Sequence, residues 1–349
     1  MKNVFIIFAI TIILITNSIC KSKKDPELRS ARNLKMINTI NEMKTTWKAA
    51  ANSRFEKMTF KDVKKLMGSL KTPEEKKPKL KNVQKIENLP ENFDLREQWS
   101  QCESIHEIRD QAGCGSCWAF GAAEAMSDRI CIASNGRLQT RISPENILSC
   151  CKMCGSGCRG GFPYMAWDMF TYDGIPTGGL YGDNKTCQPY SFKPCDHFIE
   201  GKLGPCDGEY PTPECSQSCS EGYPKTFNED KSYGSDYYRV SNDEEEIKSE
   251  IFNHGSVQAS YAVYEDFLNY KEGVYQHVEG SYMGGHAVKI IGWGVENGTK
   301  YWLIANSWNV TWGNNGFFKI LRGSDHLGIE SELVAGIPNL NSKYLKFLE

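Results

Sequence analysis

The chain has 349 residues, of which 40% are hydrophobic, so it is long enough for two lobes with a substantial core and for additional segments. Its formal net charge is −2, with 24% charged residues. No basic face argues for a nucleic-acid partner, and no acidic run argues for a solvated tail.

Residues 1–20 have the composition of a signal peptide. Lys2 precedes an apolar run over residues 4–15, and the small residues Ser18 and Cys20 follow it. A membrane anchor would need about 20 apolar residues, more than this run offers, and no later segment is apolar enough to span a bilayer. We therefore expect cleavage near Cys20, entry into the secretory pathway and no membrane partner. The destination stays open between a lysosome or other acidic vesicle and the extracellular space.

An oxidising compartment favours disulfides among the 14 cysteines. Removal of Cys20 with the signal peptide leaves an odd number, so at least one thiol cannot pair within the chain. The run CCKMCGSGC offers an alternative, because closely spaced cysteines can bind zinc; these are Cys150, Cys151, Cys154 and Cys158. We favour disulfides here and expect neither a metal nor a cofactor.

Residues 21–88 differ in composition from the rest of the chain. They are rich in lysine, lack cysteine, and carry Met36, Ile37, Ile40 and Met43 at helical spacing. Residues 73–82, PEEKKPKLKN, have the composition of an exposed linker that a protease could cut. We interpret residues 21–88 as the inhibitory propeptide of a zymogen; the alternative is a small helical extension with no inhibitory role.

Residues 89–349 predict one α+β unit with two lobes. Residues 116–131 have the composition of a helix. Residues 155–234 are rich in Gly, Pro and Cys and show little periodicity, so we expect disulfides to order them. From Val257 onward, alternating runs such as HAVKIIGWG and KYWLIANSW predict half-buried strands.

Cys117 stands at the start of the predicted helix, directly after Gly115 and Ser116. Unpaired amides at a helix N-terminus favour a thiolate, and small neighbours let a substrate approach. The alternative is a buried, inert thiol. The odd cysteine count and the position at the helix start favour a nucleophile.

A thiolate nucleophile needs an imidazole that holds positive charge and later protonates the leaving amine. His286 follows two glycines in GGHAVKIIGWG, which leave room for a substrate beside its ring. Asn306 ends a predicted strand and can orient this imidazole, with Trp308 shielding the bond from water. The Gln111 side-chain amide and the Cys117 backbone amide are candidates for stabilising an oxyanion.

Six stretches of residues 89–338 carry a resemblance to a known family: LPENFDLREQW, QAGCGSCWAF, GCRGGFP, GGHAVKIIGWG, NSWNVTWGNNGFF and GIESELVAGIP. Together they resemble the papain-like cysteine proteases of the cathepsin B type. The resemblance implies a papain-like two-lobe fold, with a helical lobe, an antiparallel β-barrel lobe and the active-site cleft between them. It implies a cysteine endopeptidase made as a zymogen. The implied partners are peptide and protein substrates, its own propeptide and cystatin-type inhibitors.

The same resemblance implies substrate-binding residues and disulfides. The substrate-binding residues are Gly160, Gly161, Pro163, Gly285, Ala287, Trp308, Glu332 and His197. Glu332 would lie at the base of the pocket for the second residue before the cleaved bond, where it would accept arginine as well as apolar side chains. The implied disulfides are Cys102–Cys131, Cys114–Cys158, Cys150–Cys215, Cys151–Cys154, Cys187–Cys219 and Cys195–Cys206, which leave Cys117 free.

His286 and Asn306 lie farther from Cys117 than the about 130 to 150 residues that are usual in the family. The cysteine-rich segment of about residues 187–219 accounts for the insertion. It resembles the occluding loop of cathepsin B, which blocks the primed end of the cleft and allows removal of C-terminal dipeptides.

The loop departs from the family pattern. The first of two carboxylate-binding histidines is kept as His197, but the second is Phe198. An ionic latch of the family falls on Leu203 and Thr311, neither of which is charged, whereas its other latch survives as Asp110 with His197. We therefore expect endopeptidase activity to dominate and C-terminal dipeptidase activity to be weak.

Three sequons mark candidate glycosylation sites at Asn184, Asn297 and Asn309. Asn309 lies beside the expected primed subsites, where a glycan would obstruct the substrate, so we expect it to be unmodified.

Two other functions remain as alternatives: a catalytically silent homologue that binds peptides or inhibitors, and a disulfide-rich extracellular binding module. Cys117, His286, Asn306 and Gln111 argue against the first. The zymogen-like segment and the unpaired thiol argue against the second.

Overall fold

The computed structural model describes residues 26–51, 60–196, 202–204 and 210–340. Its α-helices are α1 (Pro26–Glu42), α2 (Phe60–Lys64), α3 (Leu95–Gln98), α4 (Glu103–His106), α5 (Cys117–Ala133), α6 (Pro144–Cys150), α7 (Pro163–Tyr172), α8 (Phe227–Asp230) and α9 (Glu244–His254). Its strands are β1 (Trp47–Ala49), β2 (Leu80–Lys81), β3 (Phe93–Asp94), β4 (Gly234–Val240), β5 (Val257–Tyr264), β6 (Tyr270–Tyr275), β7 (Tyr282–Glu296), β8 (Thr299–Ala305), β9 (Phe317–Leu321) and β10 (Leu333–Pro338). Short 3-10 helices are η1 (Glu74–Lys76), η2 (Gly157–Arg159), η3 (Glu265–Asn269) and η4 (His326–Gly328).

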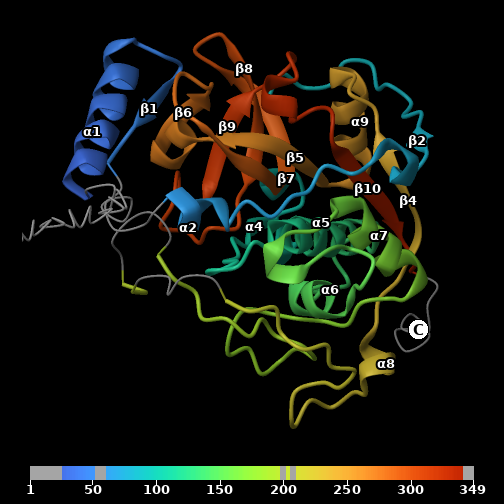
Figure 1. The fold of residues 1–349 in the computed structure, drawn as a ribbon. Coiled ribbons are helices and arrows are strands. Elements are labelled where there is room, and N and C mark those ends of the chain that lie inside the picture. Colours follow the sequence, from blue (N-terminus) through green and yellow to red (C-terminus); the bar gives the residue numbers. More distant parts are fainter. Residues whose placement is uncertain (1–25, 52–59, 197–201, 205–209, 341–349) are drawn as a thin grey trace, which may run out of the picture.

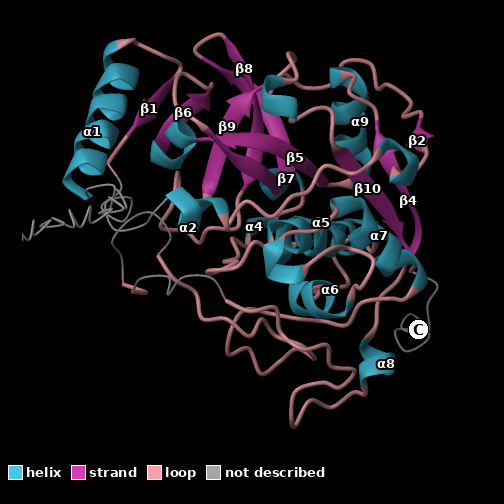
Figure 2. Ribbon diagram, viewed as in Figure 1, coloured by secondary structure: helices cyan, strands magenta, loops and turns pink. Residues whose placement is uncertain are grey.

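The α+β prediction is confirmed, with helices and strands largely separated. Figure 1 shows α5, α6 and α7 together below the sheet, and Figure 2 shows most strands in the upper part of the molecule. Each part has its own buried apolar cluster. The cluster of the sheet includes Val257, Trp302 and Ile304, and that of the helices includes Phe120 and Trp167.

The sheet differs from the expected antiparallel barrel. Its strand order is β1-β6-β9-β8-β7-β5-β10-β4-β2, with β3 paired to β7. Within the described residues this path is open, and two of its pairs, β2–β4 and β6–β9, are parallel. Both end strands, β1 and β2, come from the segment that the sequence marks as a propeptide. This segment therefore covers the edges that the remaining strands would otherwise expose.

Helix α5 runs through the interior, and its residues from Cys117 to Ile132 are all buried. A helix that is apolar on most of its faces belongs in a core. Two of its ionisable side chains are paired: Asp128 lies 3.0 Å from the Lys289 ammonium of β7, and Arg129 lies 2.9 Å from the Glu250 carboxylate of α9. These pairs fasten the helix to elements of the sheet-containing lobe.

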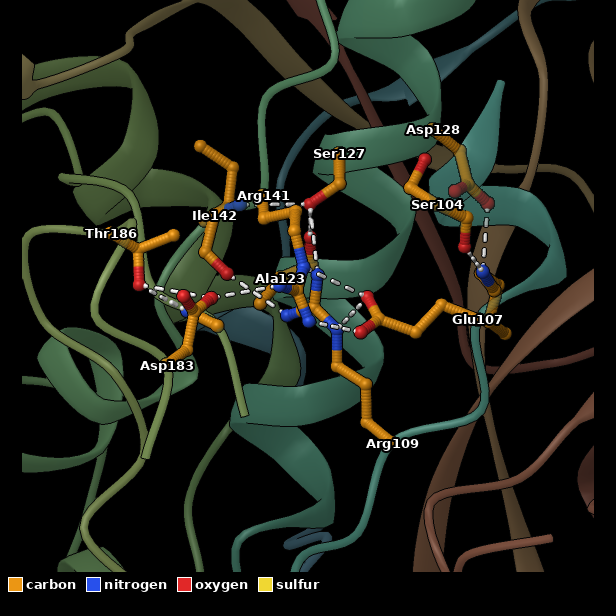
Figure 3. A network of polar contacts seen from close by, with 12 residues as sticks. Ser104, Glu107, Arg109, Ala123, Ser127, Asp128, Arg141, Ile142, Asp183 and Thr186 are labelled. Atoms are coloured by element: carbon orange, nitrogen blue, oxygen red, sulfur yellow. Dashed lines mark hydrogen bonds and ion pairs between the residues drawn. The ribbon is translucent and has the colours of Figure 1, made fainter. Parts of the chain in front are cut away.

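A second polar network holds the segment that precedes Gln111, as Figure 3 shows. Glu107 accepts hydrogen bonds from the guanidinium groups of Arg109 and Arg141, and Arg141 also donates to Asp183 at 2.8 Å. Arg109 in turn lies 3.5 Å from the Ser127 hydroxyl of α5. Burial raises the pKa of Glu107, but the two guanidinium groups outweigh burial and hold it below its ordinary value.

The N-terminal segment docks through α1 and β1. Met36, Ile37 and Ile40 are buried as the helical spacing predicts, whereas Met43 is 60% exposed because α1 ends at Glu42. Trp47 of β1 is buried, and its indole N–H donates to the carbonyl of Gln276 at 2.9 Å. Strand β1 pairs with β6 in the antiparallel sense.

Residues 155–234 contain more regular structure than expected. Helix α7 starts with a proline, which is well suited to the first turn of a helix, and buries Tyr164, Trp167 and Phe170. Its apolar periodicity lies within a stretch rich in Gly and Cys, which hid the helix in the sequence. None of the helices in the described parts of the chain is long and apolar enough to cross a membrane.

Candidate active site

Cys117 is the first residue of α5 and is fully buried. It is the free cysteine among the described residues. Ser116 occupies the N-cap position without capping the helix through its side chain. The backbone amide of Trp118 lies against the thiol instead and favours its ionised form.

Strand β7 brings His286 to the same place. The backbone amide of Ala287, the next residue, contacts the sulfur of Cys117. The Nε2 atom of His286 lies 2.7 Å from the side-chain oxygen Oδ1 of Asn306. The Trp308 ring stacks on the imidazole with 4.6 Å between centroids, so it covers this hydrogen bond as expected.

The Gln111 side chain is fixed at both ends. Its Nε2 donates to the carbonyl of Cys114 at 2.8 Å, and its Oε1 accepts from the Ser307 hydroxyl at 2.8 Å. The backbone amide of Gln111 also donates to the Ser307 carbonyl at 2.9 Å. Ser307 therefore fixes the direction in which the side-chain amide of Gln111 points, although nothing in the sequence marked Ser307 as a site residue.

Five of the implied disulfides are present: Cys102–Cys131, Cys114–Cys158, Cys150–Cys215, Cys151–Cys154 and Cys187–Cys219. The alternative zinc site is wrong, because all four of its cysteines belong to these bridges. The sixth implied pair involves Cys206, which lies outside the described residues, as does His197 with its neighbour Phe198.

Residues 66–70 of the N-terminal segment run directly across this site. The Gln111 Nε2 also donates to the Leu66 carbonyl at 2.9 Å, and the Ser69 amide donates to the Gly285 carbonyl at 3.0 Å. Gly161 exchanges backbone hydrogen bonds of 2.9 Å with Gly68 and Leu70. The groups expected to bind substrate are thus occupied by the chain's own N-terminal segment.

The glycines on both sides permit this close approach. A Cβ atom built on Gly68 would lie 1.8 Å from the Gly115 carbonyl oxygen. A Cβ on Gly285 would lie 2.4 Å from the Ser69 carbonyl oxygen, and one on Gly160 would lie 2.9 Å from that of Gly68. Any side chain at Gly68 would therefore push the segment away from the site.

The covering segment changes the chemistry of the thiol. Burial raises the pKa of Cys117 to about 11, although backbone amides from Ala287, Gly68, Trp118 and Ser69 act in the opposite direction. In this covered form burial therefore favours the protonated thiol, and the expected thiolate stays a prediction for the processed enzyme.

Glu332 is not a solvated surface residue. Its carboxylate lies 2.9 Å from the Lys77 ammonium, with side-chain exposures of 19% and 10%. Its main-chain carbonyl accepts from the amide of Ser260, which stands opposite Ala287 in the β5–β7 pair. Tyr164, next to Pro163, donates to the carbonyl of Leu333 at 3.3 Å. The structure thus brings the chain at Glu332 close to the strand that carries Ala287 and to the helix that starts at Pro163.

A profile of papain family cysteine proteases matches residues 89–337, and a profile of the propeptide of peptidase family C1 matches residues 33–73. This chain belongs to the papain family of cysteine proteases. A cathepsin B-like cysteine proteinase of Schistosoma japonicum is 49% identical over 308 residues, covering 86% of this chain and 90% of that protein. Cathepsin B-like cysteine proteinase 6 of Caenorhabditis elegans is 48% identical over 316 residues, covering 88% and 83%.

Solved structures of papain-family zymogens have the same fold. The procathepsin B of Trypanosoma congolense matches with a TM-score of 0.76 and 37% identity, over 90% of this chain and 100% of that one. The predicted papain-like fold and cathepsin B type are confirmed. Residues 66–70 therefore lie in the part of the chain that the propeptide profile matches, and this structure is that of a papain-family zymogen.

At the primed end, hydrogen bonds among the described residues fasten the base of the cysteine-rich loop of this papain-family chain. The Asp110 carboxylate accepts from the Cys195 amide at 2.9 Å and from the Asn309 side-chain amide at 3.1 Å. The Thr311 hydroxyl lies 3.3 Å from the fully buried carboxylate of Asp196. Neutral donors thus hold Asp110 and Asp196, while the expected pair of Asp110 with His197 stays a prediction, because His197 lies outside the described residues.

The three sequons of this papain-family protein differ in access. Asn184 and Asn297 are exposed, and Asn297 lies in the turn between β7 and β8. Asn309 is 6% exposed, and its side-chain nitrogen, the atom that would carry the glycan, donates to the Cys195 carbonyl and to Asp110. The folded chain therefore leaves Asn309 inaccessible to glycosylation.

Proposed function

We propose that the processed chain is a cathepsin B-like cysteine endopeptidase with weak C-terminal dipeptidase activity. The observation that carries the proposal is the 2.7 Å bond between His286 and Asn306, placed beside the free Cys117 at the start of α5. No other described cysteine is free, so the nucleophile has one candidate in the described chain. This argues against a catalytically silent homologue.

The proposed reaction gives each group a defined role. With Nε2 of His286 donating to Asn306, Nδ1 is the nitrogen that takes the proton of the Cys117 thiol. The sulfur attacks the peptide carbonyl, and the imidazolium then protonates the leaving amine, which gives an acyl-enzyme. Gln111 Nε2 and the Cys117 amide bind the oxyanion. Water brought to the acyl carbon by neutral His286 releases the product acid and restores the thiol.

The occupied cleft supports an assignment of subsites. Gly161 and Gly285 would offer a substrate the backbone bonds that they now make with residues 68–70. Glu332 would bind a basic side chain two residues before the cleaved bond, as it now binds Lys77. We expect Glu332→Ala to abolish hydrolysis of peptides with arginine at that position and to spare those with leucine. Equal loss for both peptides would refute the assignment.

The balance between the two activities depends on how the loop holds a substrate carboxylate. Phe198 stands where the family has a second histidine, so one charge for the free C-terminus is missing. Peptides with free and amidated C-termini, compared on the processed enzyme, test this point. We expect similar rates; a strong preference for the free acid would contradict the proposal.

The proposed setting is the secretory pathway, in a lysosome, another acidic vesicle or the extracellular space. The apolar run of residues 4–15 and the five disulfides support entry into an oxidising compartment. Cystatin-type inhibitors are the proposed regulators, because they would compete for the cleft that residues 66–70 occupy. Residues 1–20 lie outside the described residues, so amino-terminal sequencing of the secreted protein is the test of cleavage near Cys20.

A further inference from the structure

The hydroxyl of Tyr190 lies between the two segments that build the proposed oxyanion hole. Tyr190 belongs to the loop that follows α7 and is 2% exposed. Its hydroxyl donates to the main-chain carbonyl of Gln111 at 2.9 Å, across 79 positions of sequence. The same hydroxyl oxygen lies 3.0 Å from the Ser116 hydroxyl, one residue before Cys117.

The proton count fixes the direction of these bonds. A phenol has one hydrogen, so when Tyr190 donates to Gln111, the hydroxyl of Ser116 donates to Tyr190. Burial raises the pKa of Tyr190 well above its ordinary value, so the phenol keeps this hydrogen. The result is a chain of two bonds from the helix start to the segment of Gln111.

Ser116 uses its hydroxyl in an unusual way for its position. A serine at an N-cap normally accepts a hydrogen bond from an amide in the first turn. Ser116 makes no such bond. Its hydroxyl is directed to Tyr190, so it does not compete for the first-turn amides that face the thiol.

The rest of Tyr190 is held rigidly. Its ring meets Phe120 of α5 edge-on at 4.8 Å and Phe192 edge-on at 5.3 Å. On the other side, Ser307 already holds the amide and the side-chain oxygen of Gln111. Tyr190 holds the main-chain carbonyl of Gln111 and so fastens this residue to α5.

We propose that Tyr190 is a positioning residue for peptide hydrolysis. Its hydroxyl holds the Gln111 segment against the start of α5 and so sets the spacing of the two oxyanion donors, the side-chain amide of Gln111 and the backbone amide of Cys117. Donors of this kind stabilise a transition state only where their geometry is set in advance. The inference rests on the proposed oxyanion role of Gln111.

The test is a double-mutant cycle on the processed enzyme, with rates expressed per active site titrated with an epoxide reagent. Tyr190→Phe removes the hydroxyl and keeps the ring. We expect kcat to fall about tenfold with KM nearly unchanged, because the lost alignment is felt mainly in the transition state. In a Gln111→Ala background, the same substitution should change kcat little, because the donor that it aligns is already absent.

The matched control is Tyr275→Phe. Tyr275 lies on β6, away from the cleft, and its hydroxyl is as buried as that of Tyr190 and donates to Asp266. We expect this control to keep the wild-type kcat. If Tyr190→Phe does not fold, Ser116→Ala is the second variant, because it removes the hydroxyl that donates to the phenol oxygen. Its kcat should fall with Gln111 present and change little in the Gln111→Ala background.

Two results would overturn the inference: an unchanged kcat in Tyr190→Phe, or an equal loss with and without Gln111. A wild-type kcat in Gln111→Ala alone would instead refute the proposed role of Gln111.

Discussion

The backbone amide of Ser69 donates to the carbonyl of Gly285, directly beside the imidazole of His286, at 3.0 Å. One short main-chain bond thus places the propeptide where a substrate would bind. Together with the bonds of Gly68 and Leu70 to Gly161, it leads us to expect that the zymogen is inactive. The cleft is complete in its geometry, but it is filled.

Replacement of Gly68 by alanine should weaken this inhibition. The added Cβ would lie 1.8 Å from the Gly115 carbonyl oxygen, a backbone atom that cannot swing aside as the end of a side chain could. We expect a cost of about 1 to 3 kcal/mol to propeptide docking, as for other overpacked sites. Faster self-processing of the purified zymogen is the readout. Leu70→Ala, at a side chain that is 39% exposed, is the control and should process at nearly the wild-type rate.

Lys77 should contribute to docking through Glu332. The pair is only partly exposed, so its loss in Lys77→Met should weaken docking by about 1 kcal/mol. The rate of self-processing in a dilution series reports this change, and added salt should reduce the difference between variant and wild type. Lys76→Met, which changes an exposed neighbour, is the matched control. Equal rates for both variants would show that the ion pair contributes nothing.

Glu124 should make the fold less stable as the pH rises. It is buried in α5, and one carboxyl oxygen has no hydrogen-bond partner among the described residues. Burial raises its pKa to about 8, although Lys289 and Arg109 oppose the shift. Because the folded state binds this proton more tightly than the unfolded state, the contribution is present at acid pH. This contribution is lost as the pH rises from 4.5, the ordinary pKa of the carboxyl group, through about 8, its pKa in the folded chain.

We expect Glu124→Gln to remove this part of the pH dependence, on the order of 5 kcal/mol at most. Urea unfolding of the inhibited enzyme at pH 5 and pH 8 measures it. A wild-type slope of stability against pH in the variant would contradict the assignment to Glu124.

Acid should loosen the propeptide through His326. The backbone amide of His277 donates to His326 Nε2 at 3.0 Å, which requires that nitrogen to be unprotonated. Burial and the neighbouring His277 lower the pKa of His326, and Asp266 opposes them. The adjacent Gln276 carbonyl accepts the Trp47 indole N–H of the propeptide. A lowered pKa means that the fold around His326 loses stability as the pH falls below about 6.5, and we expect the neighbouring bond from Trp47 to Gln276 to weaken with it.

His326→Gln keeps an acceptor but does not titrate, so its propeptide should stay docked at lower pH than in the wild type. Amide exchange of residues 46–50 in a Cys117→Ser zymogen, corrected for intrinsic rates, measures docking without self-processing. His106→Gln, at an exposed histidine, should behave as the wild type. Identical pH midpoints for His326→Gln and the wild type would reject this explanation.

The chemistry of the site was predictable because nucleophile, base, orienting amide and oxyanion donor must be particular residue types. Cys117, His286, Asn306 and Gln111 carry these types in recognisable surroundings, and the structure brings them together. Ser307 and Tyr190 act through hydroxyl bonds between distant segments, for which no local pattern exists.

The fold was predictable in its class and less so in its details. Met43 fits the helical period of α1, but the helix ends one residue earlier, and sequence spacing does not fix a helix end. The two end strands of the sheet, β1 and β2, come from the propeptide, and pairing across such distances leaves no local sequence signal. The raised pKa of Cys117 likewise comes from its burial in the folded chain, which is a tertiary fact.

The most direct test is labelling of Cys117 by a peptidyl epoxide, followed by mass spectrometry of the intact zymogen and of the processed enzyme at neutral pH. The account predicts one adduct on Cys117 in the processed enzyme, none in the zymogen, and no peptide hydrolysis by the processed Cys117→Ser variant. A disulfide at Cys117, or hydrolysis that survives its replacement by serine, would contradict the account.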